Sequence, residues 1–302
     1  MGDASGRVIA VANMKGGVGK TTTVVMLAEG FAAEGARVVV LDLDAQASAS
    51  YCFAPDDELK TIISARKTIT SFLADRILLN DRVPIHDYLT PAISKVTKAG
   101  EALPIDMVAA SPRLRLLERE IILKMAEGKF GARSLEGQSL RVLQKAIGEL
   151  KETYDVILFD CAPGISAFTE VAIRLADLVV VPTIPDFLST LGFEAFRLSI
   201  WENAHVTRSS LPRPLRRPAV LPTRVSGRKR QHREVLDALM AEAGEADAPF
   251  ELFGITIGDQ AAIERAMDPE QFAEAPTFEQ KWGASVASVR GLVNEIRRRL
   301  DG

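Results

Sequence analysis

The chain has 302 residues, 47% of them apolar and 25% charged, and a formal net charge of -3. This composition excludes a globally disordered chain, because it supplies enough apolar side chains for a large buried core and too little net charge to keep the chain expanded. The two cysteines, Cys52 and Cys161, have no second Cys or His at ligand spacing, which argues against a disulfide scaffold or a zinc site and fits a reducing compartment.

Short β-branched runs alternate with longer amphipathic segments along the chain. This alternation predicts an α/β fold with a mostly parallel, twisted sheet and helices on both of its faces. Val8 to Asn13 is the first predicted strand, and after a glycine-rich loop a helix is predicted from about Lys20 to Glu34, ended by Gly35. Arg37 to Leu43 is the second predicted strand, and its unbroken apolar run indicates burial on both faces.

The segment from Pro55 to Gly100 is less regular, and there we expect the chain to diverge from its relatives. Helical periodicity runs from Ile62 to Leu79, and turn signals lie at Pro84 and Pro91. Further on, we predict helices over Pro112 to Gly128 and Leu140 to Lys151, and strands over Ile105 to Ala109, Asp155 to Asp160, Leu178 to Val181 and Ala219 to Leu221. No Gly/Ser-rich linker separates these elements, so we expect one domain over residues 1–302.

The loop after the first strand reads Lys15-Gly16-Gly17-Val18-Gly19-Lys20-Thr21-Thr22. A strand, a glycine-rich turn and a helix that begins at Lys-Thr surround an anion with backbone N–H groups and a helix N-terminus. In such a loop the ammonium of Lys20 reaches the β and γ phosphates of a nucleotide, and the hydroxyl of Thr21 reaches Mg²⁺. The loop therefore predicts ATP and Mg²⁺ as ligands.

The usual pattern G-x-x-x-x-G-K-[ST] has glycine where this chain has Met14, and this loop adds Lys15. With those departures the segment resembles the deviant phosphate loop, or deviant Walker A motif, of the ParA/MinD family of partition and positioning ATPases. In that family the first lysine crosses a dimer interface to the partner's ATP. The resemblance implies an ATP-dependent homodimer, catalytic roles for Lys15 and Lys20, and nucleotide contacts by the loop residues Lys15, Gly16, Gly17, Val18, Gly19, Lys20, Thr21 and Thr22.

Two aspartates end the second predicted strand. The run Asp42-Leu43-Asp44-Ala45-Gln46 resembles the family's D-x-D-P-Q segment, with Ala45 in place of proline. The resemblance implies that Asp44 orients the attacking water as a catalytic residue and that Asp42 lies close to the magnesium shell. Taken alone, the two residues are equally typical of a turn after a strand.

The strand predicted to end at Asp160 resembles the family's Walker B strand and the switch that follows it. One carboxylate at the end of an apolar strand suits a magnesium ion that keeps most of its waters, so Asp160 and Thr21 are the principal predicted metal residues. Val179-Val180-Val181-Pro182 resembles the strand that leads to the nucleotide base, which implies a nucleotide contact by Pro182.

The segment from Asn203 to Arg233 contains nine basic residues and no acidic one. Such a segment supplies contacts to a nucleic-acid backbone without reading bases, although a solvated loop and helix face would have the same composition. ParA-like proteins bind DNA nonspecifically through basic residues of their C-terminal half once the dimer has formed. The resemblance implies this role for Arg224, Arg228, Lys229, Arg230 and Arg233.

The last predicted helix has apolar residues at Val286, Val289, Val293, Ile296 and Leu300, with Arg297 to Arg299 beside them. A MinD-like membrane anchor would use such a helix, but its apolar face lacks Phe and Trp, so we favour packing against the sheet. No apolar stretch is long enough for a signal or a membrane span, and we expect a cytoplasmic protein that associates with the nucleoid when ATP is bound.

These inferences predict a ParA-like ATPase that forms an ATP-bound dimer, binds nonspecific DNA and positions a plasmid, a chromosome region or a protein cargo. In this family a ParB-like or other adaptor protein usually stimulates hydrolysis, so we expect weak turnover without one. Two alternatives stay open from the residues: a MinD-like membrane-associated ATPase, and a P-loop ligase or phosphotransferase that acts on a small molecule.

Overall fold

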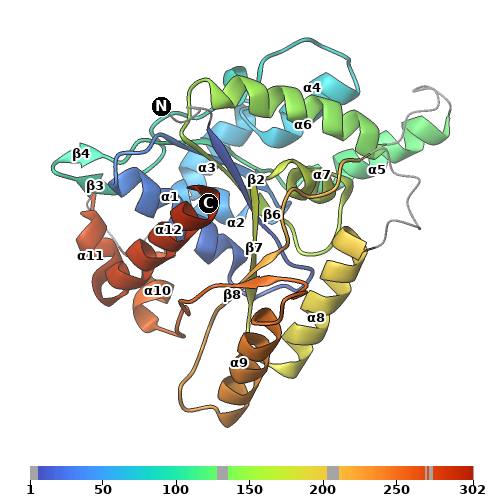
Figure 1. The fold of residues 1–302 in the computed structure, drawn as a ribbon. Coiled ribbons are helices and arrows are strands. Elements are labelled where there is room, and N and C mark those ends of the chain that lie inside the picture. The colour runs from blue at the N-terminus through green and yellow to red at the C-terminus, as the bar shows by residue number, and fades with distance from the viewer. Residues whose placement is uncertain (1–5, 128–134, 203–210, 269–270, 272–274, 302) are drawn as a thin grey trace.

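The computed structural model describes residues 6–127, 135–202, 211–268, 271 and 275–301. Seven strands form one sheet in the order β5-β2-β6-β1-β7-β8-β9, and every neighbouring pair runs parallel (Figure 1). Helices cover the sheet on both sides, so the predicted α/β fold is confirmed. The predicted helix end at Gly128 and the basic residue Arg208 lie outside the described residues.

The strands of the sheet match the predicted ones closely, with one short edge strand in addition. Their bounds are β1 Arg7–Val11, β2 Val38–Leu43, β5 Ile105–Val108, β6 Val156–Cys161, β7 Leu178–Thr183, β8 Ala219–Pro222 and β9 Glu251–Leu252. A separate antiparallel pair is formed by β3 Thr97–Lys98, at the end of the segment that the sequence leaves irregular, and β4 Glu101–Ala102, just beyond it.

The helices fall into two groups according to the core cluster that they join. On one face of the sheet lie α1 Lys20–Ala33, α2 Ser48–Phe53, α3 Asp56–Ser64, α10 Ala261–Ala266, α11 Phe278–Trp282 and α12 Val286–Asp301. On the other lie α4 Ile69–Ile77, α5 Leu114–Ala126, α6 Leu135–Lys151, α7 Ala167–Leu175, α8 Phe187–Arg197 and α9 Arg230–Ala243. Shorter helical turns are η1 Ile85–Tyr88, η2 Leu198–Glu202 and η4 Gly283–Ser285.

Side chains of β1 alternate between the hydrophobic cores on the two faces of the sheet. Val8 and Ala10 belong to one hydrophobic cluster, whereas Ile9 and Val11 belong to the other, and all four side chains are fully buried. Successive side chains of a strand point to opposite faces, so a strand with helices on both sides must be apolar throughout. That requirement explains why the unbroken β-branched runs identified the central strands.

The helix predicted over Ile62 to Leu79 is wrong, because the structure breaks it into two. The first half ends at Ser64 and the second begins at Ile69. Between them Arg66 adopts a positive φ of 60°, which an α-helix does not contain. The backbone N–H of Ile69 donates to the carbonyl of Ala109 after β5, and the Thr68 hydroxyl caps the second helix by accepting from the N–H of Ser71.

The last helix packs inside the protein. Val289, Val293 and Ile296 are fully buried against α1, where Gly30 permits close approach of the two helices. Arg297 stacks over the Phe31 ring, with 5.5 Å between the guanidinium carbon and the ring centroid. The apolar face of α12 is therefore buried in the core, as the sequence analysis favoured. In the described part of the chain no helix is long and apolar enough to cross a membrane.

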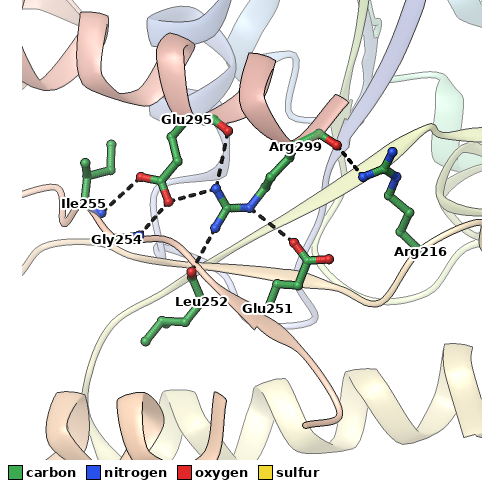
Figure 2. A network of polar contacts seen from close by, with 7 residues as sticks. All are labelled: Arg216, Glu251, Leu252, Gly254, Ile255, Glu295 and Arg299. Carbon is green, nitrogen blue, oxygen red and sulfur yellow. Dashed lines mark hydrogen bonds and ion pairs between the residues drawn. The ribbon is translucent and has the colours of Figure 1, made fainter. Parts of the chain in front are cut away.

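A polar network fastens the end of α12 to the edge of the sheet (Figure 2). The buried carboxylate of Glu295 accepts from the backbone N–H of Gly254 at 2.6 Å and of Ile255 at 3.2 Å, and it also holds Arg299 at 2.8 Å. Arg299 donates in turn to the carbonyl of Leu252, the last residue of β9. These contacts satisfy the backbone at a strand end that has no further strand beside it.

Replacement of Gly30 tests the packing of α1 against α12. A Cβ at Gly30 would lie 2.6 Å from Val293 Cγ2 and 2.9 Å from Val289 Cγ1, and valine in a helix cannot easily rotate away. We expect Gly30→Ala to lower the free energy of unfolding in urea by about 1–3 kcal/mol.

Gly148→Ala is the matched control for that experiment. Gly148 lies within α6, and a Cβ there would meet no atom within 4 Å. Alanine in an open helical position should be neutral or stabilise by up to about 1 kcal/mol. Equal unfolding free energies for the two variants would contradict the packing described for Gly30.

Candidate active site

The phosphate loop runs from the end of β1 to the start of α1. Gly17 and Gly19 have φ values of 73° and 93°, which side-chain-bearing residues rarely adopt, so the glycines fix the course of the loop. The carbonyl of Val18 accepts a hydrogen bond of 2.7 Å from the hydroxyl of Thr223, which follows β8. The loop is therefore supported by a strand whose end lies more than 200 residues further along the chain.

Lys20 turns back over the loop that precedes it. Its Nζ atom donates to the carbonyl of Lys15 at 2.9 Å, and only 7% of the residue is exposed. Burial lowers the pKa of its ammonium, while the nearby carboxylates of Asp160 and Asp44 oppose that shift. The arrangement places a poorly hydrated cation at the centre of the loop, where it is available to a phosphate group.

Thr21 and Asp160 meet at the base of the site. The hydroxyl of Thr21 donates to Asp160 Oδ2 at 2.9 Å, whereas the other oxygen, Oδ1, is buried and accepts no hydrogen bond within the described part of the chain. Burial and the neighbouring charge of Asp42 raise the pKa of Asp160 well above the ordinary value, although Thr21 and Lys20 oppose that rise. A buried carboxylate oxygen without a partner is costly, and a cation or its water would satisfy it.

Asp42 and Asp44 follow each other at the end of β2 but have different surroundings. Asp42 is fully buried, and its carboxylate accepts from the Ser50 N–H at 2.9 Å, the Ser50 hydroxyl at 2.7 Å and the Asp44 N–H at 3.0 Å. Burial raises the pKa of Asp42 to about 6. Asp44 lies at the edge of a cavity, with its Oδ1 accepting from the Gln46 N–H at 2.9 Å.

Lys15 points away from its own phosphate loop. Its Nζ atom donates to the hydroxyl of Ser189 at 2.8 Å and lies 3.7 Å from Asp186 Oδ1, at the start of α8. Asp186 also caps this helix by accepting from the Ser189 N–H at 2.7 Å. Burial tends to raise the pKa of Asp186, but hydrogen bonds from Ser189 and the charge of Lys15 lower it below its ordinary value. Asp186 is therefore a carboxylate that can pair with the Lys15 ammonium.

A cavity of about 550 Å³ opens in front of the phosphate loop. Its loop side is formed by residues between Gly16 and Thr23, with Asp44 beside them. A second group of lining residues follows β8 or lies around α10, outside the phosphate loop and the aspartate motifs: Thr223, Arg224, Ile257, Gly258, Asp259, Gln260, Ile263, Glu264 and Met267. This shape suits a triphosphate at the loop and a larger, partly apolar group toward α10.

Two predicted site residues have other surroundings than expected. Pro182 lies in fully buried β7 and is not among the lining residues; its carbonyl accepts from the side-chain amide of Asn13 at 2.8 Å. The cavity is instead lined on this side by residues that follow β8, the next strand of the sheet. Arg224 also lines the cavity, with its guanidinium 3.5 Å from the Gly17 carbonyl and 3.6 Å from Asp259, and its predicted DNA contact stays a prediction.

The basic segment divides into two structural groups. Arg216 and Arg217 donate to the backbone carbonyls of Arg299 and Ala248, so both stabilise the fold locally. Arg228, Lys229, Arg230 and Arg233 are exposed around the start of α9, and only Arg230 has an ion-pair partner among the described residues, Glu234. We name these four residues the α9 basic patch.

The α9 basic patch is held by a buried histidine. The ring of His232 is 3% exposed, and its Nδ1 accepts from the Ser226 N–H at 3.1 Å, which fixes the turn before α9. The first turn of α9 contains no acidic residue, although a helix N-terminus favours negative charge. Basic residues in this position leave a positive potential that an anionic partner would neutralise.

A family model described as an AAA domain matches residues 6–211 of the chain. The chain belongs to this family. Among relatives, the chromosome partitioning protein ParA of Myxococcus xanthus is 31% identical over 189 residues, which cover 62% of this chain and 55% of the relative. The chain is a P-loop ATPase of the ParA/MinD type. It spans about half the length of the curated relatives that it matches.

Solved structures share the fold of this ParA/MinD-type ATPase over nearly its whole length. A plasmid partition protein from Borrelia burgdorferi bound to AMPPNP has a TM-score of 0.67 at 18% identity and covers 97% of this chain and 99% of its own. A pNOB8 ParA bound to nonspecific DNA has a TM-score of 0.59 at 23% identity, with coverages of 98% and 99%. A Mycobacterium smegmatis cobyrinic acid a,c-diamide synthase with ADP and magnesium has a TM-score of 0.65 at 21% identity, with coverages of 98% and 96%.

The burial of the Asp160 carboxylate lowers the free energy of unfolding of the ligand-free protein, compared with a protein that has a neutral side chain at this position. Because the folded-state pKa of Asp160 is raised, the folded protein binds more protons than the unfolded chain from about pH 4 upward, so the free energy of unfolding falls as pH rises toward the folded pKa. Asp160→Asn removes this cost. We expect the variant to be more stable at pH 8 by about 1–3 kcal/mol, with a smaller gain at pH 4, by thermal unfolding without nucleotide.

Asp155→Asn is the control, because the pKa of Asp155 is lowered in the folded protein whereas that of Asp160 is raised. Hydrogen bonds from Arg37 lower the pKa of Asp155, against a smaller effect of burial, so its contribution is present above the unfolded pKa and disappears as pH falls through the lower folded value. That variant should show no gain at pH 8. A gain for Asp160→Asn that is equal at pH 4 and pH 8 would show that charge burial is not its origin.

Proposed function

We propose that this protein is a ParA-like ATPase that forms a dimer around two molecules of ATP, with each Lys15 reaching the partner's phosphates. The orientation of Lys15 carries the proposal. Its ammonium lies 2.8 Å from Ser189 on α8 and outside the cavity in front of its own loop, whereas Lys20 occupies the centre of that loop. A lysine so placed cannot serve the same nucleotide as Lys20 without leaving α8, and its position outside that cavity supports a role at a nucleotide bound by a second subunit.

Mg·ATP would bind with its phosphates on the loop Lys15-Gly16-Gly17-Val18-Gly19-Lys20-Thr21-Thr22. The unpartnered Oδ1 of Asp160 and the adjacent hydroxyl of Thr21 fit a magnesium ion that is held mainly by phosphate oxygens and waters. In line with such a site, the described residues contain no group of three or more His, Cys, Asp or Glu side chains arranged to hold a metal alone. The ion would neutralise charge on the phosphates. Asp42, which pairs with Asp160 across the sheet and is held by Ser50, would influence the magnesium ligands indirectly, through its charge and its position beside Asp160.

Hydrolysis would depend on Asp44 and on the two lysines. Asp44 lies at the cavity edge with one oxygen free of the Gln46 contact, so it can orient a water toward the terminal phosphate. Lys20 and the partner's Lys15 would stabilise charge that builds up on the transferred phosphoryl group. We expect slow turnover until an adaptor protein of ParB-like or other type completes the arrangement, as is usual in this family.

DNA would bind to the α9 basic patch in the ATP-bound dimer. The patch has no acidic side chain in its first helical turn and presents four exposed cations, which suits sequence-independent phosphate contacts. The likeness in fold to a ParA bound to nonspecific DNA supports this assignment. Through cycles of binding and release, the protein would position a plasmid, a chromosome region or a protein cargo.

Lys15→Gln tests the crossed lysine. The variant keeps the backbone carbonyl that Lys20 uses, so it should bind AMPPNP as the parent does, but it should stay monomeric with AMPPNP and Mg²⁺ and lose roughly 100-fold in turnover. Light scattering after size exclusion and an ATPase assay measure the two effects. Lys60→Gln is the control and should behave as the parent, because Lys60 is an exposed lysine on α3 whose ion pair among the described residues is with nearby Asp57. Nucleotide-dependent dimers of Lys15→Gln would overturn the proposal.

Charge reversal tests the DNA surface. The parent with AMPPNP should bind unrelated duplexes equally, with log K falling against log salt with a slope of roughly -3 for three phosphate contacts. Arg228→Glu/Lys229→Glu/Arg233→Glu should abolish this binding and leave dimerisation intact. Lys60→Glu/Lys95→Glu/Arg298→Glu makes the same change in net charge on other surfaces and should retain most of the affinity. Equal loss in both triple variants would mean that net charge, and not the α9 basic patch, governs binding.

A further inference from the structure

A second polar groove lies between α4 and α6, which run beside each other at the top of Figure 1. It has a volume of about 680 Å³ and shares no lining residue with the cavity at the phosphate loop. Its walls are the C-terminal end of α4 with the turn after it and one side of α6. None of its residues belongs to the sequence motifs described above.

One of the lining residues, Gln138, has a buried donor without an acceptor. The residue is 8% exposed, and its side-chain Nε2 donates no hydrogen bond within the described part of the chain. A buried amide that is left unpaired lowers stability, and such groups in folded proteins have an explanation in a ligand, an ion or a specific function. An acceptor brought into the groove would satisfy this group.

The groove is also strongly cationic. Four basic side chains line it against a single carboxylate, that of Asp81. Arg82 and Arg141 have no ion-pair partner among the described residues, and Lys145 is 3.8 Å from Glu149. The four cations are Arg76, Arg82, Arg141 and Lys145. Like charges gathered at one groove repel one another, so their assembly there favours an anionic ligand.

We propose that this groove binds a small phosphate-bearing ligand, with the buried amide of Gln138 donating to it and the arginines holding the phosphate oxygens. Guanidinium groups pair with phosphate through two parallel hydrogen bonds, and three arginines line this groove. A concave, cationic site suits a compact phosphate better than a DNA duplex, whose backbone phosphates need contacts spread along the surface. The site would be separate from the ATP site and would give the ATPase a second small-molecule input.

Calorimetric titration with inorganic phosphate tests the groove directly. Lys20→Ala serves as background, because it removes the main cation of the phosphate loop. In this background phosphate should still bind, Gln138→Leu should weaken the binding roughly tenfold, and Gln144→Leu, an exposed glutamine on the same helix, should leave it unchanged. A parallel titration with adenosine monophosphate separates the sources, since tighter binding than free phosphate identifies a nucleotide and equal binding identifies phosphate itself.

The melting temperature without phosphate separates a ligand-binding role of Gln138 from a structural one. In the Lys20→Ala background, leucine removes an unsatisfied donor, so Gln138→Leu should melt at the temperature of the background protein or above it, and phosphate should raise the melting temperature less when Gln138 is replaced. A lower melting temperature for Gln138→Leu without phosphate would show a structural glutamine. Absence of phosphate binding in the Lys20→Ala background, or full binding by Gln138→Leu, would overturn the proposal.

Discussion

The active site depends on the register between three parallel strands. Val11 at the end of β1 pairs with Asp160 of β6, and Asp160 pairs in turn with Asp42 of β2. This register brings the hydroxyl of Thr21, at the start of α1, within 2.9 Å of a carboxylate 139 positions away in sequence. A shift of one residue in either pair would turn the carboxylate to the opposite face of the sheet. The chemistry of the loop therefore rests on the packing of apolar strands.

The same register has an energetic cost. Burial raises the pKa of both Asp42 and Asp160, the charge of Asp42 raises that of Asp160 further, and one oxygen of Asp160 has no hydrogen-bond partner among the described residues. The charge of Lys20 opposes the rise in the pKa of Asp160, but burial disfavours the charged form of Lys20 as well. The ligand-free site thus holds groups that are poorly satisfied by the protein itself, which is what a site preorganised for a magnesium ion and a triphosphate requires.

The sequence predicted most of the sheet and the phosphate loop for identifiable physical reasons. Central strands must be apolar on both faces, and a loop that surrounds phosphate needs glycine at positions such as Gly17 and Gly19. The break after Ser64 could not be predicted, because it depends on a hydrogen bond from Ile69 to the distant Ala109. Tertiary contacts of this kind override a helical periodicity that continues across the break.

The wall of the cavity could not be predicted from the sequence. It is formed after β8 and around α10, by residues far apart in the sequence that are assembled only by folding, and the nucleotide contact of Pro182 stays a prediction. Arg224 is part of the basic segment, but its positive φ of 50° and its contact with Gly17 also place it beside the phosphate loop. The capping pair Asp186 and Ser189, which holds Lys15, had a readable signal: Asp-x-x-Ser at the start of an amphipathic helix.

Complementation between two inactive variants is the most direct measurement of the proposed crossed lysine. In a mixture of Lys15→Gln and Asp44→Ala subunits, each mixed dimer would contain one site with an intact Asp44 that receives Lys15 from the other subunit. If Lys15 acts across the interface, each mixed dimer should hydrolyse ATP at about half the parental rate, because one of its two sites is complete. No recovery above the separate variants, under conditions where mixed dimers are detected, would contradict a lysine that acts in the partner's site.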